Sequence, residues 1–402
     1  MKVSGKKCLL LLLLLKTACS SSSQTEMSEV HASYVNIQEN LLSSNQMLED
    51  LDVILDSMKA YFPFLGVAYR RFEIDIMEKS HRLVDILQQL EDDERWTIPQ
   101  FHWWLWDQLF NPFESVGHLR LFAPGYHHYE QLWRNRVHDF ENEPNFISDT
   151  MDDLGVAYIK INSFHVPDLE MLRNLADIRD FYHKINQYEH LIIDLTRNEG
   201  GIFATYFSEL FQPLMNEGHE MEVRGLVVDP AHPHLASRNW ISSTALLPER
   251  APHTERLAYG FLSSFRYGGR RHYQVIDGRA VRTGEESIFS GRLWVLISET
   301  TASAAEHMAR IVKDAGIATL VGQPTRGVSG IPPYIVRHRE QTPHSGLTFT
   351  FDLINFVDAY GRSFEEYTLQ PHLFSDDPLQ TVLDYISEQS ARLAKLKNRP
   401  FQ

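Results

Sequence analysis

The 402-residue sequence has little cysteine: its two cysteines, Cys8 and Cys19, both lie near the N-terminus. No thiol is left in the rest of the chain, which excludes disulfide bonds and a cysteine nucleophile there. Long apolar runs are also missing, because Leu9 to Leu15 is far shorter than the roughly 20 residues that a membrane-spanning helix needs. Acidic residues outnumber basic ones, and the net charge of −15 argues against a nucleic-acid partner.

The short apolar run is the centre of a predicted export signal. Lysines precede it and Thr17-Ala18-Cys19 follows it, as in a secretory signal peptide. Small residues before a cysteine resemble the lipobox of bacterial lipoproteins, in which the cysteine is lipidated, although Lys16 stands where an apolar residue is usual. We therefore expect a signal at residues 1–18, lipidation at Cys19 and a flexible tether at 19–37. The protein would be anchored to a bacterial membrane on its periplasmic or extracellular face, with ordinary secretion as the alternative.

Hydrophobic periodicity divides the rest of the chain into two kinds of structure. Residues 38–150 are mostly helical by pattern, with apolar residues at helical spacing from Met47 to Tyr61 and from Ile76 to Leu90. From residue 151 to 402, short apolar strands alternate with helices, which predicts a mixed α/β core. Residues from about 217 to 290 are less regular and are interpreted as an insertion over this core.

The stretch from Leu293 onward contains a candidate nucleophile. Leu293 to Ile297 predicts a buried strand, and a helix with an apolar face follows from Ser303. A serine at a strand-to-helix junction presents its hydroxyl beside the free N–H groups of the first helical turn, which can stabilise an oxyanion. The alternative is structural, because Ser303-Ala-Ala-Glu306 also fits a capping box. On the local pattern alone the cap is the commoner explanation.

A second stretch, Asp194-Leu-Thr-Arg-Asn-Glu-Gly-Gly201, ends another predicted strand with two glycines. Glycine lets the backbone turn sharply and approach a substrate carbonyl closely, which leaves an N–H group to donate. Most Gly-Gly turns are only turns, so this pattern needs support from elsewhere in the chain.

These two stretches together resemble the C-terminal-processing-peptidase and tricorn-core family of serine peptidases. The pattern is Asp-Leu-x-x-Asn-x-Gly-Gly, followed about a hundred residues later by Thr-Ala-Ser-Ala-x-Glu around Ser303. The resemblance covers roughly Glu114 to Pro371. It implies a crotonase-like α/β core, Ser303 as nucleophile, and an oxyanion hole formed by the Gly200–Gly201 turn and the N–H of Ala304.

The sequence departs from the processing peptidases and is closer to the tricorn-like branch. Those peptidases carry a lysine just past a Gly-x-Thr-x-Gly turn, whereas Gly327 is followed here by Val328-Ser329. The tricorn-like branch uses a histidine from the N-terminal part, oriented by a C-terminal glutamate. Ser115-Val-Gly-His118 resembles its Asp-Gly-His-Thr segment, and Glu365 lies in a stretch similar to its Glu-Gly-x-Gly-Val-x-Pro. The segment after His118 is too short for a PDZ domain.

The resemblance implies a triad whose roles make chemical sense. Neutral His118 would take the Ser303 proton and pass it to the leaving amine, while Glu365 would fix the histidine tautomer. Glu366 adjoins Glu365, so the sequence leaves open which of the two orients His118. Ser115 is either an accessory site residue or a cap.

The sequence thus predicts an exported serine peptidase acting on peptides or proteins, with no cofactor and no metal. The histidine pairs in the chain lack the third ligand and the spacing of a zinc site. The alternative is an inactive relative that binds hydrophobic ligands or peptides, since the fold resembles that of interphotoreceptor retinoid-binding protein. Such a carrier needs a large apolar pocket. The sequence does not determine the oligomeric state.

Overall fold

The computed structural model describes residues 41–397 except 92, 114–115, 126–142, 216–218, 230, 237–258, 268–272, 277–278, 283–286, 328–335 and 359. The predicted signal, Cys19, the tether and Ser115 therefore lie outside the described residues. None of the described helices combines the length and the apolar character that a membrane span requires.

A six-stranded sheet forms the centre of the C-terminal part. Its order is β16 (Leu373–Phe374), β12 (Ala318–Gly322), β11 (Arg292–Ile297), β6 (His190–Asp194), β5 (Val156–Ile161) and β4 (Phe146–Met151). All neighbours are parallel except β4 and β5. In β11, Val295 faces one apolar cluster and Trp294 faces the other. A parallel strand that is buried on both faces needs a continuous apolar run, which is what the sequence has there.

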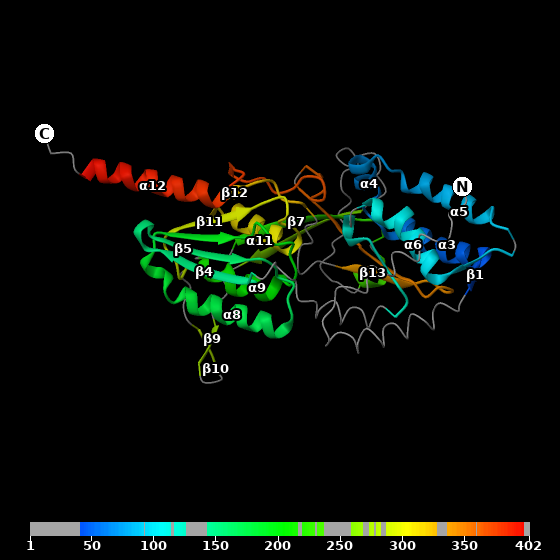
Figure 1. The fold of residues 1–402 in the computed structure, drawn as a ribbon, viewed down its shortest axis with the longest axis horizontal. Coiled ribbons are helices and arrows are strands. Elements are labelled where there is room, and N and C mark those ends of the chain that lie inside the picture. The colour runs from blue at the N-terminus through cyan, green and yellow to red at the C-terminus, as the bar shows by residue number, and fades with distance from the viewer. Residues whose placement is uncertain are drawn as a thin grey trace.

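Helices cover both faces of this sheet (Figure 1). On one face lie α8 (Asp168–Tyr182), α9 (Phe203–Leu210) and α11 (Ser303–Asp314). On the other face, Val382 and Ile386 of α12 (Pro378–Lys397) pack against β5, β6 and β11. The expected mixed α/β core is therefore confirmed.

The N-terminal part is helical, as expected. It contains α3 (Ser44–Tyr61), α4 (Leu65–Phe72), α5 (Ile76–Gln88) and α6 (Ile98–Leu105), with a short pair of strands, β1 (Leu41–Ser43) and β2 (Arg95–Thr97). Local sequence defines the helix starts: Ser43 and Gln46 form a capping box before α3, and Asp75 accepts hydrogen bonds from the first turn of α5. A π-helical turn (Trp106–Phe110) and two 3-10 turns (Asn111–Phe113 and Val116–His118) follow α6.

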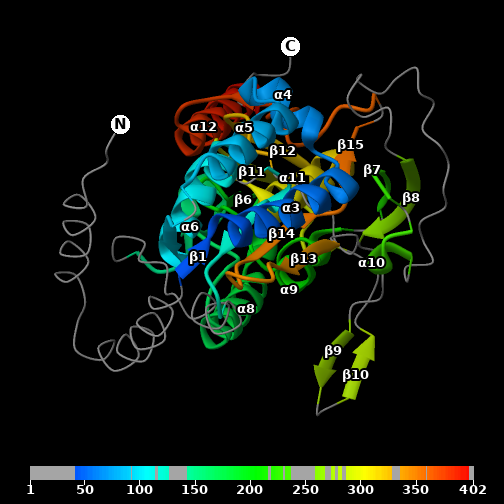
Figure 2. The same ribbon diagram turned by 90° about the vertical axis from the view of Figure 1, so that its right-hand side faces the viewer.

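The helical part shares its core with strands from the far end of the chain. The strands β3 (Arg120–Phe122), β14 (Thr348–Asp352) and β13 (Arg337–Gln341) form an antiparallel sheet. Phe349 and Phe351 belong to the same apolar cluster as Leu51 and Phe101. Figure 2 shows the helix α3 beside β13 and β14. The chain thus returns to the helical part between β12 and β16, the last two strands that it adds to the central sheet.

The predicted insertion contains strands where it is described. A third sheet has the order β15 (Asn355–Val357), β7 (His219–Val227) and β8 (Tyr259–Tyr267). A hairpin of β9 (Tyr273–Ile276) and β10 (Arg279–Arg282) projects from the body in Figure 1. The short helix α10 (Pro233–Ala236) follows β7, and Leu235 is buried in the core of the helical part.

Candidate active site

Ser303 is the first residue of α11 and does not cap it. The N-cap residue is Ala302, and no side chain caps the helix. The carboxylate of Glu306 accepts a hydrogen bond from the N–H of Gly327 at 2.8 Å and binds Arg310 at 2.8 Å. The capping-box explanation of this motif is therefore wrong. Among the described residues, the Ser303 hydroxyl has no hydrogen-bond partner.

The backbone is strained at two of the predicted catalytic residues. Within the described part of the chain, the non-glycine residues with positive φ are Glu73, His118 and Ser303, at 57°, 52° and 51°. Glu73 simply ends α4. A left-handed non-glycine residue costs about 1–2 kcal/mol, so the surrounding structure must impose it. Such strain clusters at functional sites, and here it occurs at both Ser303 and His118.

The Gly-Gly turn lies directly against the serine. Gly200 has a φ of 99°, and a Cβ atom there would lie 2.7 Å from the Cβ of Ser303 and 2.8 Å from the nitrogen of Ala304. Only glycine fits in this position. The buried Asn198 holds the turn, because its Oδ1 accepts the N–H of Gly200 at 2.9 Å and its Nδ2 donates to Ile161 O at 3.0 Å. This asparagine belongs to the sequence motif, but its role in holding the turn was not predicted from the sequence.

Two N–H groups near Ser303 remain for an oxyanion. The N–H of Gly200 is occupied by Asn198, but those of Gly201 and Ala304 have no acceptor among the described residues. The N–H groups of Gly201 and Ala304 belong to loops that meet at the carboxyl ends of parallel strands. Backbone hydrogen bonds join these loops, because Ala302 N donates to Asn198 O at 3.1 Å and Ser303 N donates to Gly327 O at 3.3 Å. The positive end of the α11 dipole adds to this environment.

His118 lies in a turn just before β3, and the strand register determines its partner. Because β3 pairs with β14 through Thr350 and Arg120, the same register continued by two residues brings His118 opposite Asp352. The Nδ1 of His118 lies 2.6 Å from Oδ2 of Asp352. Arg337 on β13 donates to the other oxygen, Oδ1, at 2.9 Å. The Asp352 side chain is therefore held between two basic groups.

The environment of Asp352 favours its charged form. Burial alone would raise the pKa of Asp352, but His118 and Arg337 outweigh it and hold that pKa below its usual range. The alternation Thr348-Phe-Thr-Phe-Asp352 puts Asp352 on the polar face of its strand, and this is the only sequence signal for it. Asp352 is therefore a site residue that was not predicted from the sequence.

Glu365 lies beside the histidine turn but binds a different atom. Its Oε1 accepts the N–H of Gly117 at 3.1 Å, and its side chain is buried. The carboxylate contact at His118 Nδ1, which sequence analysis assigned to Glu365, is made by Asp352. Burial raises the pKa of Glu365 to about 8, opposed by the Gly117 hydrogen bond and reinforced by Asp352.

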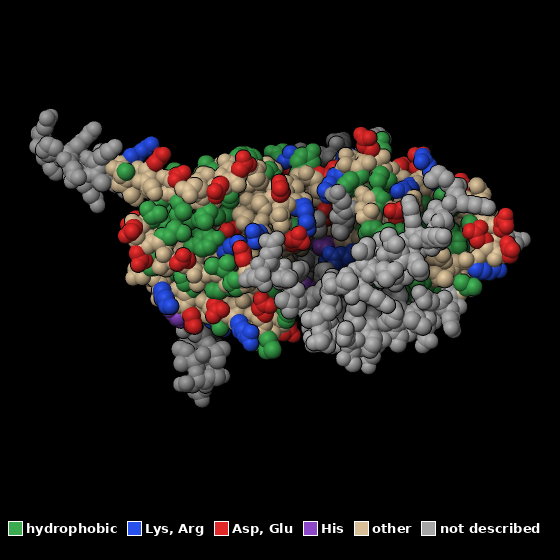
Figure 3. Space-filling view, in the orientation of Figure 1, with side chains coloured by type: hydrophobic (Ala, Val, Ile, Leu, Met, Phe, Trp, Pro, Cys, Tyr) green, Lys and Arg blue, Asp and Glu red, His purple; other side chains and the backbone are tan. Residues whose placement is uncertain are grey.

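Glu365 contacts both sides of the site: its side chain binds the turn before His118, and its backbone packs against the loop beside Ser303. A Cβ atom on Gly327 would lie 3.4 Å from Glu365 O, so the backbone at Glu365 packs against the loop that pairs with Ser303. Glu366 points the other way and binds Arg70 of α4 through two hydrogen bonds of 2.7 and 2.6 Å. Figure 3 shows a hollow between the two halves of the molecule, where histidine and Lys or Arg side chains are visible.

Within the described part of the chain, no hydrogen bond joins His118 to Ser303. Catalytic hydrogen bonds are often long or badly aligned without substrate and tighten when it binds.

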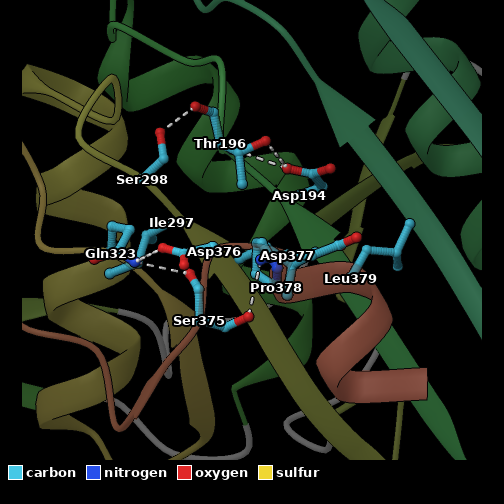
Figure 4. Close-up of a pocket in the computed structure, with 11 residues that line it drawn as sticks. Asp194, Thr196, Ile297, Ser298, Gln323, Ser375, Asp376, Asp377, Pro378 and Leu379 are labelled. Carbon is cyan, nitrogen blue, oxygen red and sulfur yellow. Dashed lines mark hydrogen bonds between the residues drawn. The ribbon is translucent and has the colours of Figure 1, made fainter. Parts of the chain in front are cut away.

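A pocket of about 250 Å³ lies at the carboxyl ends of β6, β11 and β12, beside the start of α12 (Figure 4). Carboxylates of Asp194, Asp376 and Asp377 line it, together with Ser298 and Gln323. This is not the large apolar cavity that a carrier of hydrophobic ligands would need. The described residues also include no group of three or more His, Cys, Asp or Glu side chains arranged to hold a metal ion.

Comparison with known proteins identifies the family. The model of peptidase family S41 matches residues 155–374, which is more than half of the chain. The structure is similar to that of a Parabacteroides merdae protein assigned as a peptidase, with 13% identity, 86% of this chain and 97% of that chain covered, and a TM-score of 0.54. A lipoprotein from Streptococcus agalactiae has the same identity and coverage with a TM-score of 0.49. Mature CPAF also matches, with 13% identity, 89% and 99% coverage, and a TM-score of 0.49.

Proposed function

The chain belongs to peptidase family S41 and is a serine-type peptidase, and we propose that it is an exported enzyme that cleaves peptides through an acyl-enzyme on Ser303. In this proposal the Oγ of Ser303 attacks the peptide carbonyl carbon while His118 accepts the hydroxyl proton. The C–N bond then breaks, and His118 passes the proton to the leaving amine. Water releases the acyl group by the same route, with His118 again the base and then the acid.

We propose Asp352 for the orienting role that sequence analysis gives to Glu365. Its contact of 2.6 Å with His118 Nδ1 supports this role, because a carboxylate there fixes the tautomer and stabilises the imidazolium. The charged form of Asp352 is favoured by its second partner, Arg337. We propose the N–H groups of Gly201 and Ala304 as the oxyanion hole, with Gly200 shaping the turn.

One observation carries the proposal most directly: the left-handed Ser303 begins α11 with its side chain against Gly200. A φ of 51° at a helix start has no advantage for the helix itself. It places the Cβ of Ser303 where a Cβ on Gly200 would come within 2.7 Å, and we propose that the attacked carbonyl binds beside this contact.

Fluorophosphonate labelling of the folded protein tests this proposal. We expect a single adduct by intact mass, absent from the Ser303→Ala and His118→Ala variants. Ser387→Ala on the exposed side of α12 is a matched control and should be labelled like wild type. A folded wild-type protein that takes no adduct would contradict the proposal. An adduct lost only in Ser303→Ala would keep the nucleophile but reject His118 as the base.

The export part of the proposal rests on the sequence. We propose that residues 1–18 are removed and that Cys19 is lipidated, which would anchor the enzyme at the cell envelope of a bacterium. Expression in a bacterial host with radiolabelled palmitate should label the protein, and Cys19→Ser should abolish the label. Equal labelling of the two proteins would reject lipidation at this residue.

A further inference from the structure

The turn that carries His118 is held at the residue before it. The N–H of Gly117 donates to Oε1 of Glu365 at 3.1 Å. Gly117 and His118 are both left-handed, with φ of 55° and 52°. Consecutive residues in this conformation are unfavourable unless neighbouring groups hold them. On the other side, a Cβ atom on Gly117 would lie 2.5 Å from the ring of Phe64, so the turn is confined between Phe64 and Glu365.

The surroundings of Glu365 do not suit a negative charge. Its Oε2 is buried and has no hydrogen-bond partner among the described residues. Among the described residues, Nη1 of Arg71 forms a long ion pair of 3.9 Å with this oxygen, and it donates to the backbone oxygen of Glu365 at the shorter distance of 3.1 Å. The other ionisable groups that face it, Asp352 and Glu306, are themselves acidic.

Asp352, unlike Glu365, has a basic partner at each of its carboxylate oxygens. His118 and Arg337 each bind one of its oxygens, at 2.6 and 2.9 Å. When two carboxyl groups are close together in a buried site, the better-partnered one ionises and the other keeps its proton. The pKa of Asp352 is lowered and the pKa of Glu365 is raised to about 8, in agreement with this contact pattern.

We infer that Glu365 is a positioning residue that works as an uncharged carboxylic acid: it holds the Gly117–His118 turn, while Asp352 alone supplies the negative charge beside the imidazole. This inference rests on the proposed function, in which His118 is the general base. What Glu365 must supply is a carbonyl oxygen as acceptor for Gly117. A glutamine side chain offers the same acceptor without the possibility of ionising.

The experiment compares Glu365→Gln, Glu365→Ala and Asp352→Asn by their second-order rates of labelling with a fluorophosphonate probe at pH 7. We expect Glu365→Gln to stay within about threefold of wild type, because the hydrogen bond to Gly117 is kept. Glu365→Ala should be slower by about 10- to 100-fold, because the turn that carries His118 loses its support and misplacing a reacting group by about 1 Å can cost about a hundredfold. Asp352→Asn should be slower by about a hundredfold or more, because the imidazole loses its counter-charge. Circular dichroism and thermal unfolding check that each variant is folded.

The pH profile supplies a readout that a merely structural role would not change. Above about pH 8, wild-type Glu365 ionises, and repulsion between its charge and Asp352 should displace the Gly117–His118 turn, so the labelling rate should fall. The Glu365→Gln variant has no such group and should keep its rate through this range. The same fall in both proteins would overturn the inference.

Failure of the inference and failure of the proposed function give different results. If wild type is labelled and Glu365→Gln is as slow as Asp352→Asn, then Glu365 acts as a charged residue and the inference is wrong. If Asp352→Asn is labelled as fast as wild type, the inference is also wrong. If folded wild type is not labelled at all, the proposed function itself fails.

Discussion

The two sides of the candidate site are built in different ways. The Ser303 side consists of loops after parallel strands, and each loop is one continuous sequence motif, such as Asp194–Gly201. The His118 side consists of antiparallel strands whose residues are more than two hundred positions apart, such as His118 and Asp352. The first kind of site can be recognised in a sequence because its parts are local. The second kind depends on how distant strands pair.

The two sides also differ in what holds their strained residue. Backbone hydrogen bonds from Ala302 to Asn198 and from Ser303 to Gly327 hold the serine. Side chains hold the histidine, namely Asp352 at Nδ1 and, through Gly117, Glu365. We therefore expect substitutions of supporting side chains to affect the histidine side more, and changes of backbone shape to affect the serine side more.

The largest effect should come from removing the nucleophile. Ser303→Ala should lower the hydrolysis of a protein substrate such as casein by about 10⁴-fold or more, as in other serine hydrolases. Turnover by wild type and variant can be measured as release of fluorescent peptides from labelled casein. Residual activity within tenfold of wild type would reject Ser303 as nucleophile.

A change of backbone shape beside the serine should be the next most severe. Gly200→Ala would bring a methyl group to 2.7 Å from the Cβ of Ser303, so the fluorophosphonate labelling rate should fall by about a hundredfold, the cost of misplacing a reacting group by about 1 Å. Gly316→Ala is a matched control, because Gly316 also has a positive φ of 69° but no atom within 4 Å of a new Cβ. It should cost about 1 kcal/mol of stability and leave labelling unchanged. An equal loss of labelling in both variants would mean that the strain of a positive φ is responsible, and not the close contact between residue 200 and Ser303.

Acid should destabilise the protein through buried neutral histidines. Burial lowers the pKa of His307 on α11 to about 3, with Arg310 adding to the effect. Between its unfolded pKa of about 6.5 and this value, the unfolded chain binds a proton that the folded protein does not. The free energy of unfolding should then fall by up to about 1.4 kcal/mol per pH unit as the pH drops below about 6.5. Urea unfolding at pH 7, 6 and 5 measures this slope.

The matched variant for this test is His307→Gln. Its free energy of unfolding should depend less on pH than that of wild type, even if its stability at pH 7 is lower. On the His118 side, burial also lowers the pKa of His338 and of His232, so part of the slope should remain. An unchanged slope in His307→Gln would show that this histidine does not control the acid sensitivity.

The smallest effect should come from the ion pair that joins the helical part to the site. Arg70 binds Glu366 next to Glu365, and the two side chains are 31% and 11% exposed. Because solvent screens such a pair, Arg70→Ala should cost about 1 kcal/mol or less and slow labelling only a few-fold. Arg392→Ala removes a fully solvated pair with Glu388, 70% exposed on both sides, and should change neither quantity. Equal stability and equal labelling of the two variants would show that the Arg70 contact does not support the site.

Much of the fold could be predicted from the sequence. The apolar run Leu293–Ile297, the helix from Ser303 and the helical pattern of α3 are local features, because strand burial and helix periodicity are encoded in neighbouring residues. The Gly-Gly turn was also recognisable, since the backbone shape it needs excludes other residues. The sequence alone therefore determined the α/β core, the helical part and the family.

Only the tertiary structure decided which groups act together. Ser303 does not cap its helix because the folded chain puts Ala302 at the N-cap, and Glu306 binds Gly327 and Arg310 instead of closing a capping box. The partner of His118 depended on the register of β3 and β14, in which a shift of one residue would turn Asp352 to the opposite face. Asp352 and Glu365 are both acids in the C-terminal third of the chain. Their different charges arise from burial and from their neighbours, which are properties of the folded protein.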